Sequence, residues 1–303
     1  MRQSQDNLPS QSASYSLGNL VSLPMSPSEK RIKNLSRGLS LSVTKLAKDI
    51  EPRYVHRLRT TIRRIEAVVA SAPLDLSKKQ QGSLKKLAAL RKRAGRVRDL
   101  DVQLDLLGAI ANGSTATDKS MLAELLQQKR EKHAERLNRA IEQYRTPKFS
   151  SHVKGVFRKA AEASQGQGSA EALRRAKEQL GALGAEFEDH QALKPSLLHE
   201  VRIKLKGIRY LGELAEESEE QQRFLDEMKN VQDALGAWHD WEELTKTADK
   251  QFGDRANCPL LLEIRALFAA RQSAAKAAAL LLFARNIRKQ PRTASVRVLA
   301  KRA

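Results

Sequence analysis

The sequence predicts an all-α fold, and three observations support this. Apolar residues recur every three or four positions over long stretches, which is the period of an amphipathic helix. No stretch shows sustained alternation of apolar and polar residues with β-branched enrichment, as strands do. Proline stands where several of these stretches begin or end, as at Pro52, Pro147 and Pro259. We therefore expect a chain of helices joined by short turns.

In the first half, helical periodicity begins directly after Ser28, which suits an N-cap. The next helix starts at Pro52, since proline fits the first helical turn. A third helix starts near Ser77 and continues or restarts at Asp99. The expected helices of this half span residues 29–50, 52–73, 77–110 and 118–145, followed by a shorter one after Pro147.

The segment 164–169 is rich in Gly, Ser and Gln, and we expect it to link two halves of the chain. Beyond it, the expected helices span residues 170–188, 195–217, 219–238, 240–252 and 259–288. The resulting division is a disordered leader over 1–28, a first helical repeat over 29–163, a second over 169–290, and a basic tail over 291–303.

The chain is strongly basic. Its 303 residues include 55 Lys and Arg against 35 Asp and Glu, a net charge of +20. Such an excess indicates a polyanionic partner, either nucleic acid, an anionic membrane surface or another phosphate polymer. Aromatic residues make up only 4%, which argues against a protein that reads single strands by base stacking. The lone Cys258 excludes an intrachain disulfide framework and a multi-cysteine zinc site.

We expect no membrane partner. No apolar run reaches the roughly 20 residues that span a bilayer, and the best candidate, Ala277 to Ala284, is short and flanked by cations. Residues 1–28 lack the compact apolar region of a signal peptide. These observations predict a cytoplasmic protein.

Two stretches carry a row of cations along one face of an expected helix, because positions i, i+3 and i+7 share a face. In both, an apolar stripe on another face suits burial. The rows consist of His56, Arg59 and Arg63 with Arg64 beside them, and of His199, Arg202, Lys206 and Arg209.

A second pair of motifs supports an internal duplication. Gly95, Asp99 and Asp101 match Gly236, Asp240 and Glu242 at an offset of 141 residues, close to the 143 that separates His56 from His199. We expect the two glycines to permit close helix packing or a kink, because glycine otherwise weakens a helix. We expect Asp99 and Asp240 to be buried partners that orient Arg or His, and Trp238 and Trp241 to be core residues.

These motifs resemble those of the CHAD domain, the conserved histidine α-helical domain. The resemblance covers roughly residues 29–290 and rests on His56-x-x-Arg59-x-x-x-Arg63-Arg64, Gly95-x-x-Arg98-Asp99-x-Asp101-Val102, His199-x-x-Arg202-x-x-x-Lys206 and Leu235-Gly236-x-x-His239-Asp240. It implies two antiparallel four-helix bundles related by a pseudo-two-fold axis, with a basic central surface that binds inorganic polyphosphate. His239 stands where the first half has Arg98. The Glu-x-Glu-x-Lys signature of a fused triphosphate-tunnel enzyme is absent, so the chain resembles the stand-alone form.

The expected function is non-catalytic binding of inorganic polyphosphate in a groove between the two rows. Guanidinium forks match phosphate oxygens, and charge-assisted hydrogen bonds are the strong ones. A cluster on the third helix extends the track, and Lys204 flanks it. The expected binding residues are His56, Arg59, Arg63, Arg64, Lys92, Arg96, His199, Arg202, Lys204, Lys206 and Arg209. We expect no catalytic residue, metal ligand or cofactor.

Two alternatives stay open. A nucleic-acid-binding protein fits the charge equally well, but the sequence shows no helix-turn-helix, zinc or RNA-recognition signature. The other alternative is a polyphosphate phosphohydrolase. The sequence argues against it, because it has no Gly-x-x-x-x-Gly-Lys loop and no His-x-x-x-His pair. The cytoplasm is the expected location, and the sequence leaves open whether the protein is found at polyphosphate granules there. The sequence leaves the oligomeric state open.

Overall fold

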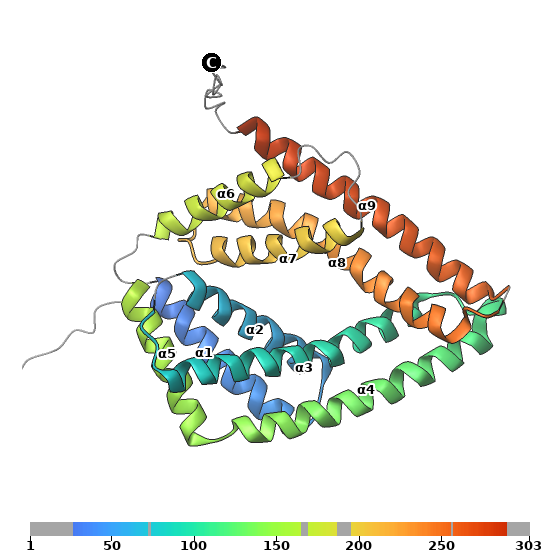
Figure 1. Cartoon of the computed structure of the whole chain (residues 1–303), viewed down its shortest axis with the longest axis horizontal. Coiled ribbons are helices and arrows are strands. Elements are labelled where there is room, and N and C mark those ends of the chain that lie inside the picture. The colour runs from blue at the N-terminus through green and yellow to red at the C-terminus, as the bar shows by residue number, and fades with distance from the viewer. Residues whose placement is uncertain (1–26, 72–73, 165–168, 187–194, 256, 290–303) are drawn as a thin grey trace, which may run out of the picture.

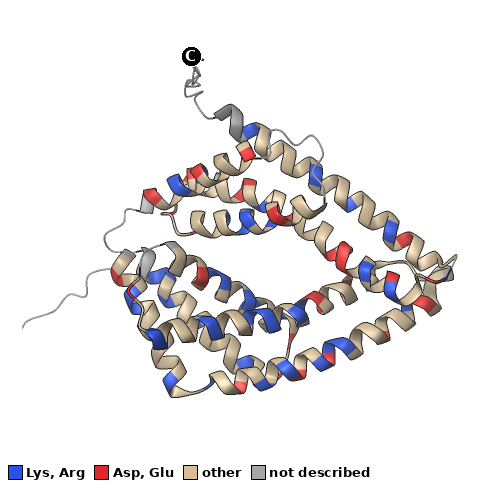
Figure 2. Cartoon of the chain, viewed as in Figure 1, with Lys and Arg blue, Asp and Glu red and all other residues tan. Residues whose placement is uncertain are grey.

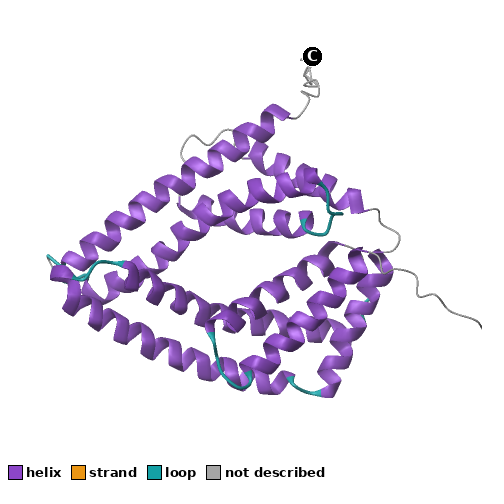
Figure 3. Ribbon diagram, turned by 180° about the vertical axis from the view of Figure 1, so that it is seen from behind, coloured by secondary structure: helices purple, strands orange, loops and turns teal. Residues whose placement is uncertain are grey.

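The computed structural model describes residues 27–71, 74–164, 169–186, 195–255 and 257–289, and all regular structure in these residues is helical (Figure 3). The expected linker centre and basic tail, and the expected leader apart from its last two residues, lie outside them. The helices are α1 (Pro27–Leu46), α2 (Pro52–Ser71), α3 (Lys78–Ala109), the 3-10 turn η1 (Gly113–Thr115), α4 (Ala116–Tyr144), α5 (Pro147–Ser164), α6 (Ser169–Glu186), α7 (Pro195–Gly212), α8 (Glu219–Phe252) and α9 (Pro259–Lys289).

Helices α1 to α5 surround one core. The apolar stripe of α2, including Leu58 and Ile62, is fully buried against Leu87 and Leu90 of α3. Burial of such stripes stabilises the bundle by about 1.5–3 kcal/mol per large aliphatic side chain. Ser77 caps α3 in a capping box, as its side chain accepts from the amide of Gln80 while the Gln80 side chain accepts from the Ser77 amide. The start expected for this helix is therefore confirmed.

Helices α6 to α9 surround a second core. Its largest member is Trp238, which is fully buried, and Met228 and Leu205 pack in the same cluster. Trp241 is also buried, so both tryptophans are core residues as predicted.

A third core joins the two halves. It forms where the long helices α3 and α4 of one half meet α8 and α9 of the other, at the right of Figure 1. Leu107 and Leu126 come from the first half, and Phe252 and Ile264 from the second, and all four are at most 1% exposed. The two halves are thus joined by shared apolar burial, which a description as two separate four-helix bundles does not include.

Helix α8 is continuous over 219–252, whereas a break before Asp240 was expected; the buried residues of this stretch, including Trp238 and Trp241, follow one helical period, so nothing interrupts it. Helix α3 continues through Asp99, which is one of the two possibilities that the sequence left open. Helix α7 ends at Gly212, where an added Cβ would lie 2.6 Å from Phe224, so glycine lets α8 pack against this end.

Helix α9 corrects the expectation that no stretch could span a bilayer. By length and composition alone, Pro259–Arg285 is long and apolar enough, and only 22% of its most apolar window is buried. Its inner residues Ile264, Ala275 and Ala279 are fully buried, while Leu281 is 60% exposed. A core helix of a soluble protein passes the same test of length and composition, so this finding is weak evidence for a membrane.

Candidate anion-binding site

The two cationic rows face each other. Helix α2 packs against α7, and α3 against α8, so the four helices meet in the middle of the molecule (Figure 1). A groove of about 440 Å³ lies between them. Its walls hold seven Lys and Arg side chains and three carboxylates. The expected binding residues that line it are His56, Arg59, Arg63, Arg64, Arg202, Lys206 and Arg209.

The basic residues at the centre of the groove, Arg202 and Lys206, are buried or partly buried and form no ion pair among the described residues. Arg202 is only 8% exposed, and within the described part of the chain its buried Nε has no hydrogen-bond partner. Burial lowers its pKa to about 10, although the negative charge of Asp240 opposes this. Beside it, burial lowers the pKa of Lys206 to about 6, and the charges of Arg202 and Arg63 lower it further. A bound anion would favour the charged forms of both side chains and raise their pKa values again.

The cations at the rim are paired. Arg59 lies 3.0 Å from Asp99, and Arg64 donates to Glu213 at 2.8 Å. Arg209 donates to the side-chain oxygen of Gln232 at 3.1 Å. Among the described residues, the basic side chains at the centre of the groove therefore form no ion pair, whereas those at its rim are held in place by polar contacts.

The comparisons with known proteins identify the family of this chain. A sequence model of the CHAD domain matches residues 35–249. The chain belongs to the CHAD family. This family is known for polyphosphate-related roles, and its domain is generally a binding domain.

Two solved structures share the fold of this CHAD domain. The crystal structure of the CHAD domain from the plant Ricinus communis has 18% identity and a TM-score of 0.59, covering 87% of this chain and 91% of that one. PptA from Streptomyces chartreusis has 18% identity and a TM-score of 0.55, covering 86% and 96%. No curated protein sequence matches the chain.

The histidines of the CHAD motifs lie in different surroundings. His56 lines the groove, and its pKa is lowered, first by burial and then by Arg98 and Arg59. His199 does not line the groove; its ring lies 5.4 Å from that of His239. Burial and the charge of Arg202 lower the pKa of His239 to about 3, so this imidazole is neutral at physiological pH.

Besides His199, three expected binding residues lie outside the groove. Lys204 pairs with Glu186 and Glu200 at 2.8 and 2.9 Å, because two residues along a helix turn the side chain by about 200° from Arg202. Lys92 and Arg96 are exposed on the outer side of α3, and Arg96 lies close enough to His133 of α4 to lower its pKa.

The groove also contains residues that sequence reasoning did not assign to it. Arg98 lines it and stands within the CHAD motif after Gly95, which was the available signal. Tyr210 lines it too; burial and the charge of Arg59 lower the pKa of Arg63, and the contact with Tyr210 partly opposes this. No pattern in the sequence distinguished Tyr210 from a core residue.

The aspartates only partly follow the expectation. Asp99 pairs with Arg59, but its side chain is 47% exposed and therefore not buried. Asp240 lies in the groove wall, where burial raises its pKa. The buried carboxylate is Asp101, which pairs with Arg130 at 2.6 Å.

The two motif glycines do not serve helix packing, which corrects that prediction. A Cβ at Gly95 or Gly236 would meet no atom within 4 Å. Helices α3 and α8 are continuous at these positions. Gly236 lines the groove, so its missing side chain leaves the groove open.

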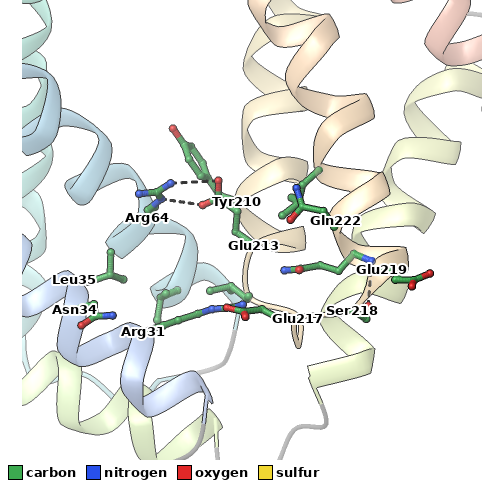
Figure 4. Close-up of a pocket in the computed structure, with 14 residues that line it drawn as sticks. Arg31, Asn34, Leu35, Arg64, Tyr210, Glu213, Glu217, Ser218, Glu219 and Gln222 are labelled. Carbon is green, nitrogen blue, oxygen red and sulfur yellow. Dashed lines mark hydrogen bonds and ion pairs between the residues drawn. The ribbon is translucent and has the colours of Figure 1, made fainter.

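A larger cavity of about 760 Å³ adjoins the groove between α1, α2, α7 and α8 (Figure 4). The two hollows share Arg64 and Tyr210 as a common wall. Glu213, Glu217 and Glu219 line this second cavity, so its charge is mixed and it is a poorer site for a polyanion than the groove.

One group of potential metal ligands occurs in the described residues. Donor atoms of His239, Glu242 and Glu243 lie within 4.8 Å of one another. The Lys246 ammonium already lies 3.2 Å from Glu242 and 2.9 Å from Glu243. These carboxylates thus have a cationic partner of their own.

Proposed function

We propose that this protein binds inorganic polyphosphate in the groove between α2 and α7, without hydrolysing it. The observation that supports this most directly is the cluster of Arg63, Arg202 and Lys206. Arg202 is buried, Arg63 and Lys206 beside it are partly buried, and the Nε of Arg202 has no acceptor in the described part of the chain. Leaving such groups unpaired is costly, and a row of phosphates would supply the missing acceptors.

The geometry supports a polymer better than a single phosphate. The cations run along two helices, and neighbours one turn apart on a helix are about 5–6 Å apart at Cβ. A flexible phosphate chain can therefore contact the centre and both rims of the groove at once. Arg and Lys supply different contacts, since guanidinium forks bind two oxygens and the ammonium acts as a point charge.

The proposal is tested with the variant Arg63→Gln/Arg202→Gln/Lys206→Gln. A matched control removes three cations of the second half that lie outside the groove, Lys177→Gln/Arg223→Gln/Arg271→Gln, with the same formal change in net charge. Both are compared with the wild type for long-chain polyphosphate binding at several salt concentrations. Circular dichroism and thermal melting verify the fold.

We expect wild-type affinity to fall steeply with salt, because bound polyanions release counterions. The groove variant should lose affinity at least about 100-fold, since charge-assisted contacts contribute roughly 1.5–3 kcal/mol each. The control should change little. Equal losses in the two variants would show that net charge, not the groove, binds the ligand.

Two further measurements address the alternatives. Duplex DNA or transfer RNA should displace polyphosphate poorly at equal phosphate concentration; efficient displacement would assign the groove to nucleic acid. Incubation with magnesium or manganese should release no orthophosphate. If the wild type released orthophosphate from polyphosphate and the groove variant did not, the protein would be a hydrolase.

A further inference from the structure

Within the described part of the chain, the excess of basic over acidic residues lies entirely in the first half. Residues 27–164 contain 31 Lys and Arg against 14 Asp and Glu, whereas residues 169–289 contain 19 against 20. The groove draws cations from both halves, so it does not account for this asymmetry. The first half must present much of its excess charge on its outer surface.

The outer face of α3 and α4 carries a dense part of this excess. Between Lys78 and Arg98, helix α3 holds nine Lys and Arg and no acidic residue. Figure 2 shows Lys and Arg along both helices. We call the following set the outer basic surface: Lys92, Arg93 and Arg96 of α3, and His133, Arg136 and Arg139 of α4.

The two helices place these residues side by side. Asp101 of α3 pairs with Arg130 of α4, which fixes the register of the two helices. Arg96 and Arg136 both lie near enough to His133 to lower its pKa. Within the described residues, the five Lys and Arg of this surface have no hydrogen bond or ion pair, and all five are exposed. An exposed cation surface without internal acidic partners is suited to an external polyanion.

We propose that the outer basic surface binds the segment of a polyphosphate chain that extends out of the groove. This rests on the proposed function of the groove. The two sites are continuous on α3: Arg98 and Asp99 line the groove, and Arg96 is three residues from Asp99, so the two are neighbours on the helix surface. A chain leaving the groove over Asp99 would next meet Arg96, then Lys92 and Arg136.

The path around α3 favours a flexible chain over a nucleic-acid duplex. From the groove face to the outer face, the ligand must bend around a helix only about 10–12 Å across. A duplex with a persistence length of about 50 nm cannot follow such a curve without a large bending cost. A single phosphoanhydride chain has no stacked bases to resist the bend.

The test variant is Lys92→Gln/Arg96→Gln/Arg136→Gln, compared with the wild type and with the Lys177/Arg223/Arg271 control. Affinity is measured for tripolyphosphate, which engages the groove alone, and for long-chain polyphosphate. We expect the affinity for the long chain to fall about tenfold and its salt slope to decrease by about 3, one for each lost contact. The affinity for tripolyphosphate should be unchanged.

Other outcomes separate this inference from the proposed function. If neither ligand binds the wild type, the proposed function fails. If the groove variant loses tripolyphosphate but the outer variant retains full affinity for the long chain, only this inference fails. An outer variant that loses duplex DNA or transfer RNA while keeping long-chain polyphosphate would make the surface a nucleic-acid site. Equal losses for both polyphosphates would also contradict a separate outer site.

Discussion

Arg64 of α2 holds Glu213, which follows directly after the end of α7, and this contact connects the two halves at one end of the groove. The guanidinium donates to both carboxylate oxygens, at 2.8 and 3.4 Å. Arg209 lies 3.3 Å from the same carboxylate. One acid thus neutralises two rim arginines, and a bound phosphate must compete with it.

The change Glu213→Gln should therefore strengthen polyphosphate binding a few-fold, because both arginines become available. The free energy of unfolding should fall by up to about 1 kcal/mol, as a partly exposed charge pair between the halves is lost. Calorimetric titration and chemical denaturation measure the two effects. Glu219→Gln, at a carboxylate that is 93% exposed, serves as the control and should change neither. Weaker binding by Glu213→Gln would contradict the competition.

Lys206 predicts a pH dependence. Its pKa of about 6 in the free groove leaves the amine mostly neutral at pH 8, and bound phosphates would raise that pKa. Binding then takes up a proton. The affinity for long-chain polyphosphate should therefore fall by up to about tenfold for each unit that the pH is raised from 6 to 8. Lys206→Met should flatten this slope. Titration calorimetry in buffers of different ionisation enthalpy counts the proton, and His56→Gln shows whether the imidazole contributes to the slope.

The same group affects stability. Its folded pKa of about 6 lies below its ordinary value of 10.5, so the unfolded chain binds more protons across that window. The free energy of unfolding that this lysine contributes therefore rises with pH between about 6 and 10.5. Lys206→Met removes that dependence, and we expect it to stabilise the protein by about 0.5–2 kcal/mol at pH 7. Denaturation curves at pH 7 and 9 check the sign, since the gain should shrink at the higher pH.

Gly95 and Gly236 offer a matched pair in equivalent motifs. Alanine at either position meets no atom within 4 Å and should raise the free energy of unfolding by about 0.5–1 kcal/mol, as helix propensity predicts. Substitution by leucine should affect binding at only one of the two positions. Gly236→Leu puts a side chain into the groove and weakens polyphosphate binding, whereas Gly95→Leu does not. Equal affinity of the two leucine variants would show that the ligand does not approach α8.

The third core predicts that the halves unfold together. Phe252 is 1% exposed and packs with residues of both halves. Phe252→Ala should cost about 3–5 kcal/mol and lower the stability of the whole protein in one cooperative transition. Coincident curves from tryptophan fluorescence, which reports the second half and the shared core, and from circular dichroism would show this. Two separated transitions would mean that the halves are independent.

Much of the site could be predicted from the sequence because it rests on local geometry. The helical period places His56, Arg59 and Arg63 on one face of α2, and the structure has them together in the groove. The same period could not exclude Lys204, whose acidic partner Glu186 lies on another helix. Nor could it show that Arg96 faces α4 and not the groove, because that depends on how α3 is rotated in its bundle.

Residue order and a fixed helical period are sufficient to predict the helices, the row of cations on each motif helix and the excess of positive charge. Which rows meet, which cations form ion pairs and which are buried depends on how the helices pack. This packing joins the halves through a shared core and places Lys206 among other cations away from water. Those properties arise from the distances between side chains far apart in the chain, which packing sets and local order does not contain.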